Sequence, residues 1–250
     1  MTAAEVVAVL AAGLAAGTIN TVVGSGTLIT FPVLLAVGYS PVVANVSNTI
    51  GLVPGSVSGS IGYRAELAGQ KARILRLSAA SLLGGITGAV LLLVLPASAF
   101  KAIVPVLIAV ALILVVAQPR LAAALAARRS RARPHGGPGL LAGIYGTGVY
   151  GGFFGAAQGI ILLALMGIAL DEDLQRINAI KNVLASLVNG VAAVIFIAVA
   201  HVAWLPAALI AAGSAAGGQL GAHLGRRLPP AVLRGVIVVV GIAAIVGLVT

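Results

Sequence analysis

The sequence contains no cysteine and very few acidic residues: of its 250 residues, only five are aspartate or glutamate. Without cysteine the chain can form no disulfide, no thiolate metal site and no cysteine nucleophile. Charged residues of both signs make up 8% of the chain, whereas soluble domains carry about 25%. So little charge cannot cover a folded surface with groups that water solvates, and a soluble globular protein is therefore excluded.

The scarcity of carboxylates also argues against an enzyme. The five lie near the N-terminus or in connections between apolar runs: Glu5, Glu66, Asp171, Glu172 and Asp173. No apolar run contains a carboxylate pair, a His-Glu-x-x-His motif or a serine–histidine spacing typical of a hydrolase. We therefore predict a protein without enzymatic activity, metal or cofactor.

Continuous apolar runs are abundant. The chain is 60% hydrophobic with a mean hydropathy of +1.17, and several runs approach the ~20 residues that cross a bilayer as a helix. The runs do not alternate between apolar and polar residues as the strands of a membrane barrel do. We predict an all-α polytopic protein of the cytoplasmic membrane, with apolar segments at 4–22, 26–38, 41–62, 74–95, 100–117, 139–156, 158–170, 178–200, 204–224 and 231–249.

These segments form two groups of five, and the two groups resemble each other. Residues 81–89 and 214–222 share the pattern Ser-x-x-Gly-Gly-x-x-Gly-Ala. Residues 95–103 match residues 228–236 at the same separation. The glycines of the shared pattern are predicted to be positions where helices pack closely, because small residues let membrane helices approach.

Upstream, the same alignment pairs Gly24 with Gly155 and Asn48 with Asn182, if the second copy has three more residues before Asn182. The duplication predicts three parts of the chain. Residues 1–117 form a first transmembrane repeat, residues 118–138 a basic cytoplasmic linker, and residues 139–250 a second transmembrane repeat.

Basic residues determine the predicted orientation. They crowd three connections, with Arg64, Lys71, Arg73 and Arg76 in one, Arg120, Arg128, Arg129, Arg131 and Arg133 in another, and Arg226, Arg227 and Arg234 in a third. The positive-inside rule makes this side cytoplasmic and both termini external. Each half then has three crossings plus a hairpin, so the halves run in opposite senses. Such inverted-topology repeats are typical of secondary transporters, whose site lies near the midplane.

The net charge of +10 is explained by this topology and by contact with membrane lipids, and we predict no nucleic-acid partner. Homo-oligomerisation is left open. The segments 26–38 and 158–170 are too short for a comfortable crossing. Each is interpreted as the return limb of a glycine-broken, re-entrant-type hairpin, whose irregular backbone must be buried in protein or line water.

The first hairpin offers Asn20, Ser25 and Thr27 as candidate binding residues. Its glycines permit tight turning and close approach of a ligand to the backbone. The N–H groups that open the return helix favour an anion. The alternative is plain helix packing by small residues.

The remaining candidates are Asn48, Gln158, Lys181 and Asn182. A lysine inside an apolar run is costly unless it faces a polar cavity or a partner, so Lys181 is a candidate by default. Its alternative is to extend its ammonium group to the cytoplasmic interface beside Arg176. Asn48 and Asn182, as equivalent residues of opposed repeats, are expected to face one cavity.

Several of these stretches resemble a known family. In the first half they are Gly13-Leu-Ala-Ala-Gly17, Gly24-Ser-Gly26 and Ala44-Asn-Val-Ser-Asn48; in the second they are Gly151-Gly-Phe-Phe-Gly155 and Asn178-Ala-Ile-Lys181-Asn182. Over nearly its whole length the chain resembles the TauE/SafE sulfite exporter family of the 4-toluenesulfonate uptake permease superfamily. The resemblance implies an inner-membrane transporter of sulfite, sulfonates or related anions. The chain departs from the family's glycine run at Ala156-Ala157-Gln158, which places a large amide at the expected site.

The sequence therefore predicts a secondary transporter that moves a small sulfur-containing oxyanion or organic anion through a site at the midplane between the repeats. An anion channel of the same fold is the alternative, and a non-transporting membrane partner or sensor is a third. Saturable flux with counter-transport would distinguish the carrier from the channel. Because no predicted span contains a carboxylate except Glu5 at an edge, we expect efflux driven by the membrane potential without a coupling ion.

Overall fold

The computed structural model describes residues 1–127 and 136–224, together with residues 235, 238, 239 and 242. This part of the chain is helical and contains no strand. In chain order its elements are α1 (Ala3–Val22), α2 (Thr27–Ala36), α3 (Pro41–Gly62), the 3-10 helix η1 (Arg64–Leu67), α4 (Lys71–Val94), α5 (Ala97–Ala127), α6 (Pro138–Phe153), α7 (Gln158–Ala169), α8 (Leu174–Val199) and α9 (Trp204–Leu224). Most of the expected segment 231–249 and the arginines from 128 to 133 lie outside the described residues.

Four of these helices are long and apolar enough to cross a membrane: α1, α4, the part of α5 from Ala97 to Arg120, and α8. Two shorter apolar helices, α2 and α7, coincide with the short segments expected at 26–38 and 158–170. The prediction of an all-α chain with several apolar helices is confirmed for the described residues, and these helices are compatible with a membrane protein. Helix α5 continues to Ala127, so the first part of the stretch interpreted as a linker is helical.

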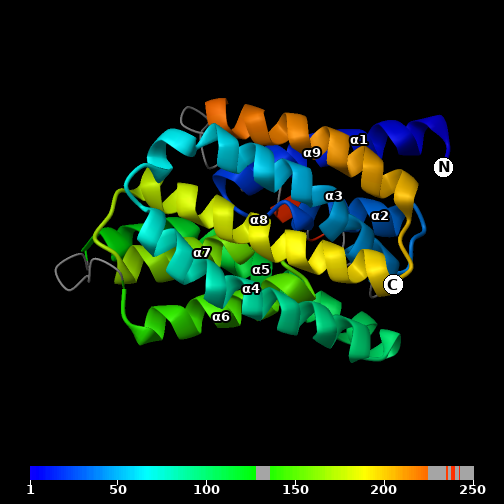
Figure 1. The fold of residues 1–250 in the computed structure, drawn as a ribbon. Coiled ribbons are helices and arrows are strands. Elements are labelled where there is room, and N and C mark those ends of the chain that lie inside the picture. The colour runs from blue at the N-terminus through cyan, green and yellow to red at the C-terminus, as the bar shows by residue number, and fades with distance from the viewer. Residues whose placement is uncertain (128–135, 225–234, 236–237, 240–241, 243–250) are drawn as a thin grey trace.

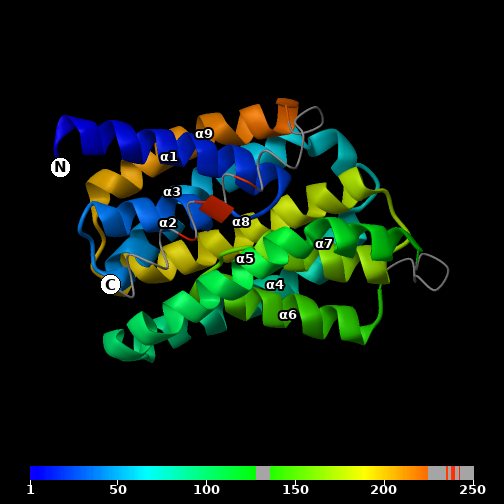
Figure 2. The ribbon, with the colours of Figure 1, turned by 180° about the vertical axis from the view of Figure 1, so that it is seen from behind.

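The connections between helices gather at two opposite ends of the bundle (Figures 1 and 2). The N-terminus and the connections 37–40, 95–96 and 200–203 lie at one end, and the connections 63–70 and 170–173 lie at the other. We call the second the basic end, because Arg64 and Lys71 lie in or beside its first connection.

Two helical hairpins enter the bundle from these opposite ends (Figures 1 and 2). Helix α1 runs inward from the N-terminal end, residues 23–26 turn the chain, and α2 returns to the same end. Helix α6 runs inward from the basic end, residues 154–157 turn the chain, and α7 returns to the basic end. The two turns therefore meet inside the protein, at the depth where irregular backbone needs protein partners.

The first helix of each half packs against the fourth helix of the other half, α1 on α9 and α6 on α4. A Cβ atom on Gly17 would lie 2.7 Å from the Cα of Ser214, and one on Gly148 would lie 2.7 Å from the carbonyl oxygen of Ser81. These distances leave no room for a side chain, so glycine is needed for the close approach. The predicted packing role of the repeated glycines is confirmed, because added Cβ atoms would collide with the backbone of the facing helix at Gly84, Gly88, Gly217 and Gly221.

Phenylalanine rings hold the second turn in place. The ring of Phe154 lies edge-on to that of Phe31 on α2, with centroids 5.2 Å apart. The ring of Phe100 on α5 contacts Phe153 and Phe154 at 5.5 and 6.2 Å. Such edge-to-face pairs add to the free energy that burial of the rings contributes, so α2 and α5 fix the depth of the 154–157 turn.

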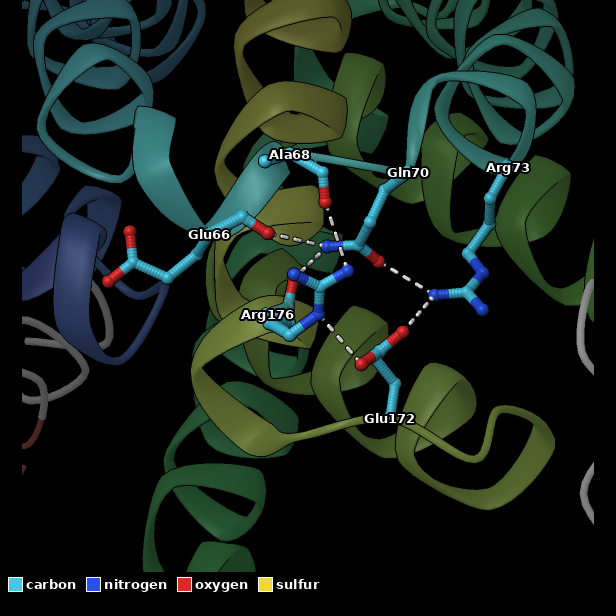
Figure 3. Close-up of polar contacts among 6 residues, drawn as sticks. All are labelled: Glu66, Ala68, Gln70, Arg73, Glu172 and Arg176. Atoms are coloured by element: carbon cyan, nitrogen blue, oxygen red, sulfur yellow. Dashed lines mark hydrogen bonds and ion pairs between the residues drawn. The ribbon is translucent and has the colours of Figure 1, made fainter.

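At the basic end, polar groups of both halves form one connected set (Figure 3). We call it the basic-end cluster, and its members are Glu66, Ala68, Gln70, Arg73, Glu172 and Arg176. Arg73 Nη1 lies 2.8 Å from Glu172 Oε2, and Arg176 Nε lies 2.7 Å from Glu172 Oε1. Glu172 thus forms ion pairs with an arginine of each half.

The charge state of Glu172 follows from this position. Burial raises the pKa of its carboxyl group. Hydrogen bonds from Arg73 and Arg176, together with the positive charges of these arginines, lower the pKa by more than burial raises it. The net result is a pKa below the ordinary value of glutamate. Glu172 is therefore an anion at neutral pH, and its ion pairs weaken only as the pH falls through the lowered pKa.

Candidate functional site

The two hairpin turns touch through their backbones. The Gly159 N–H donates to the Gly24 carbonyl oxygen at 3.1 Å. A Cβ atom on either glycine would overlap the Cα of the other. Gly24 and Gly155 both have positive φ values, 87° and 77°, which side chains rarely allow. The glycines at the turns thus permit a contact between backbones that no other residue allows.

Ala157 adopts a φ of 61° directly before α7. A non-glycine residue in this left-handed region carries strain of about 1–2 kcal/mol. This is the stretch where the chain has alanine and glutamine in place of the family's expected glycines. The backbone keeps a conformation suited to glycine, and Gln158, which is 3% exposed, begins the return helix.

Lys181 lies on the second turn of α8 and is fully buried. Its Nζ donates to the carbonyl oxygens of Asn20 and Thr21 at 2.9 and 3.0 Å. These carbonyls belong to the last turn of α1, where helix geometry leaves them without N–H partners and with partial negative charge. The alternative in which Lys181 extends to the interface beside Arg176 is wrong, because its ammonium group points into the protein at the end of α1.

The Thr21 carbonyl oxygen has more donors around it than it can satisfy. Besides Lys181 Nζ, the amide groups of Asn178 and Asn182 reach it, each with Nδ2 at 3.3 Å. A carbonyl oxygen has two lone pairs, and an ammonium group has three N–H bonds, of which two have partners here. The place therefore holds a surplus of hydrogen-bond donors.

The end of α6 is held in a related but neutral way. Asn45 on α3 donates through Nδ2 to the Phe153 carbonyl oxygen at 2.9 Å. The Tyr150 hydroxyl donates to the carbonyl oxygen of Ala156 within the same turn. Each broken hairpin thus has its first helix capped by an asparagine of the other half, but only the end of α1 has a lysine as well.

Two of the predicted site residues flank the contact between the turns and have unused polar atoms. Ser25 is fully buried, and its hydroxyl has no hydrogen-bond partner. Gln158 is also buried, and its amide Nε2 has no partner. A buried polar group without a partner costs free energy, so these atoms are where a ligand or water would be stabilised.

The other predicted residues fall into two groups. Asn48 donates to Thr27 Oγ1 at 3.3 Å and accepts from the hydroxyl of Thr30, so this group lies at the start of α2. Asn20 donates to Ser56 Oγ at 3.2 Å and accepts from the Gly26 N–H at 3.4 Å, close to Lys181 and Asn182. No hydrogen bond joins Asn48 to Asn182. Both side chains bind the first hairpin, Asn48 at the start of α2 and Asn182 at the end of α1.

Asn45 and Asn178 were not among the predicted site residues. They are separated by the same number of residues as Ser81 and Ser214, and each precedes a predicted residue by one helical turn. The duplication was therefore the signal that could have found them. Among the described residues, no group of three His, Asp or Glu side chains could hold a metal ion.

The sequence is similar to those of known membrane transporter proteins. Residues 9–248 match the model of the family described as "Sulfite exporter TauE/SafE". The chain is 29% identical, over 217 residues, to proteins of Escherichia coli strains K12 and O157:H7 named "Probable membrane transporter protein YfcA", covering 85% of this chain and 76% of theirs. No solved structure matches the chain. The chain belongs to the TauE/SafE sulfite exporter family and is a multi-pass membrane transporter.

Proposed function

We propose that the protein is a secondary transporter of a small sulfur-containing oxyanion or organic anion, such as sulfite or a sulfonate, across the cytoplasmic membrane. The observation that carries the proposal is the burial of Lys181 with only helix-end carbonyls as partners. Every carboxylate of the chain lies near the N-terminus or in a connection. A cation at this depth lacks a full counter-charge, which an anionic substrate would supply.

The surrounding donors favour an oxyanion over a neutral solute. Ser25, Gln158 and the third N–H of Lys181 are available, and Asn182 shares an acceptor that is already satisfied. The binding residues are accordingly Asn20, Ser25, Thr27, Asn48, Gln158, Lys181 and Asn182. Asn178, which shares the Thr21 carbonyl, is added to them. A hydrogen bond from the Lys181 ammonium group to an oxyanion would be charge-assisted, and such bonds are roughly twice as strong as neutral ones.

The repeats are proposed to be residues 1–117 and 139–250, inverted with respect to each other, with 118–138 as the cytoplasmic linker. The opposed entry of the two hairpins supports this arrangement (Figures 1 and 2), as does the reciprocal packing at Gly17–Ser214 and Gly148–Ser81. The capping contacts of Asn45 and Asn178 favour an alignment of Asn48 with Lys181, one residue away from Asn182.

The orientation can be tested with single cysteines, because the chain has none of its own. A membrane-impermeant maleimide added to intact cells is expected to label Thr2→Cys but not Ser130→Cys, since the basic linker faces the cytoplasm. Permeabilised cells provide the control, in which both positions should react. Labelling of Ser130→Cys alone in intact cells would contradict the proposed orientation.

Transport itself is expected to be electrogenic. In proteoliposomes loaded with sulfite, sulfate, thiosulfate or a sulfonate, a valinomycin-set negative interior should speed efflux of the carried anion. Each negative charge is driven outward by about 2.3 kcal/mol per 100 mV, and no buried carboxylate is present to bind a coupling cation. Flux that saturates supports a carrier, whereas flux proportional to concentration would indicate a channel. Efflux that does not respond to the membrane potential but responds to a pH step would indicate proton coupling and would contradict electrogenic efflux.

A further inference from the structure

The basic-end cluster ties the two halves of the protein together. Three contacts cross between halves: Arg73 to Glu172 at 2.8 Å, Gln70 Nε2 to the Arg176 carbonyl oxygen at 3.4 Å, and Arg176 Nη2 to the Ala68 carbonyl oxygen at 3.1 Å. Figure 3 shows Glu172 between the two arginines, joined to both. The Arg73 and Glu172 side chains are only 11% and 19% exposed, so this ion pair is shielded from water and is stronger than a pair on the surface.

Within the part of the chain that the structure describes, the opposite end of the bundle shows no comparable set of charged contacts. Its connections 37–40 and 200–203 contain no Asp, Glu, Lys or Arg. There the halves are joined by a neutral bond, in which the Ala203 N–H donates to Ser47 Oγ at 2.9 Å. If the halves are related as repeats, these two ends occupy equivalent places in the fold. The charged cluster is therefore a property of the basic end and is not demanded by the architecture.

Two of the helices that meet at the cluster, α7 and α8, lead to the candidate site. Helix α8 carries Arg176 in its first turn and Lys181 about 7.5 Å further along, at 1.5 Å per residue. Helix α7 begins at Gln158 and ends at the turn that holds Glu172. Because helices move as rigid bodies, a shift of α7 and α8 that opened the site toward the basic end would separate Glu172 from Arg73.

We propose that the basic-end cluster is a latch that closes the basic end of the transport path, and that Glu172 must part from Arg73 for the site to open there. The latch keeps the present closed arrangement the more populated state, and the open state is reached when these bonds are exchanged for water. The proposal rests on the transport function proposed above. It does not depend on which solute is carried.

The test uses Ala179→Cys as a reporter, since Ala179 is fully buried on α8 between Arg176 and Lys181. In detergent, a water-soluble maleimide should react slowly with this cysteine. Adding Glu172→Gln should raise the reaction rate by about tenfold or more, because it removes both charge-assisted bonds at once. Asp171→Asn is the matched control, an exposed carboxylate of the same turn, and should leave the rate unchanged.

Arg73→Gln should also raise the rate, and the double variant should gain little more, since each single variant already abolishes the Arg73–Glu172 ion pair. Equal rates in Glu172→Gln and Asp171→Asn would overturn the latch.

A second experiment keeps the proposal testable if these variants fail to fold. It uses the double variant Arg73→Cys with Glu172→Cys, in which a short bifunctional reagent containing a cleavable disulfide joins the two cysteines. Joined protein should show no counterflow, and cleavage should restore it. Unchanged counterflow in joined protein would also overturn the latch. If counterflow stayed absent after cleavage while the maleimide reaction rates were as expected, the result would count against the proposed substrate and not against the latch.

Discussion

Gly24→Ala protein is expected to unfold at a much lower temperature than the unchanged protein, with a loss of about 2–6 kcal/mol in the free energy of unfolding. Two causes add. The residue has a φ of 87°, which a side chain tolerates only at a cost, and its new Cβ would overlap the backbone of Gly159. The backbone of Gly159 cannot withdraw without separating the two hairpins. Thermal unfolding in detergent measures the effect.

Gly38 provides the matched control for this prediction. It also has a positive φ, 96°, but nothing lies within 4 Å of an added Cβ. Gly38→Ala should therefore cost only the strain, about 1–3 kcal/mol. If the two variants lost equal stability, the backbone contact between the hairpins would be absent from the folded protein, and the assembly of the site described above would be wrong.

Lys181→Gln is expected to weaken binding of the transported anion by about 1.5–3 kcal/mol, or roughly 10- to 150-fold in Kd. Glutamine can still donate to the carbonyls at the end of α1, so the fold should survive while the positive charge is lost. Lys181→Arg should restore binding only in part, because a planar guanidinium does not fit a fully buried ammonium site. Isothermal titration with sulfite, thiosulfate and a sulfonate provides the measurement.

Lys101→Gln is the control for charge alone, because Lys101 is exposed near the start of α5 and distant in sequence from the site. It should leave the Kd unchanged. Equal affinity in Lys181→Gln and unchanged protein would reduce Lys181 to a cap for α1. The burial of Lys181 would then no longer support the proposed anion site.

The helices were predictable from the sequence because long apolar runs, bounded by glycine and proline, are typical of helices that cross a membrane. The short limb expected at 158–170 is α7, Gln158–Ala169. The end of α5 was not predictable in this way. Its apolar run stops near Gln118, yet the helix continues to Ala127, because alanine and leucine favour helix whether or not they face lipid.

The sequence predicted side chains of the candidate site but not the backbone groups that they bind. Lys181 and Asn182 were found because polar groups within a membrane span are costly and therefore noticeable. Their partners are backbone carbonyls of Asn20 and Thr21, roughly 160 residues away, and every residue has such a carbonyl. A sequence pattern cannot say which carbonyl a distant side chain will reach, so the surplus of donors at Thr21 emerged only from the fold.

The capping of α1 by Lys181 also bears on how the chain is made. The lysine follows Asn20 by 161 residues, and ribosomes add about 5–20 residues per second. The open end of α1 therefore waits about ten to thirty seconds in the membrane before its donors are synthesised. During this interval water or other chains must satisfy its carbonyls. The first half cannot reach its final structure until the second half has been inserted, so biogenesis of the two halves is a single event.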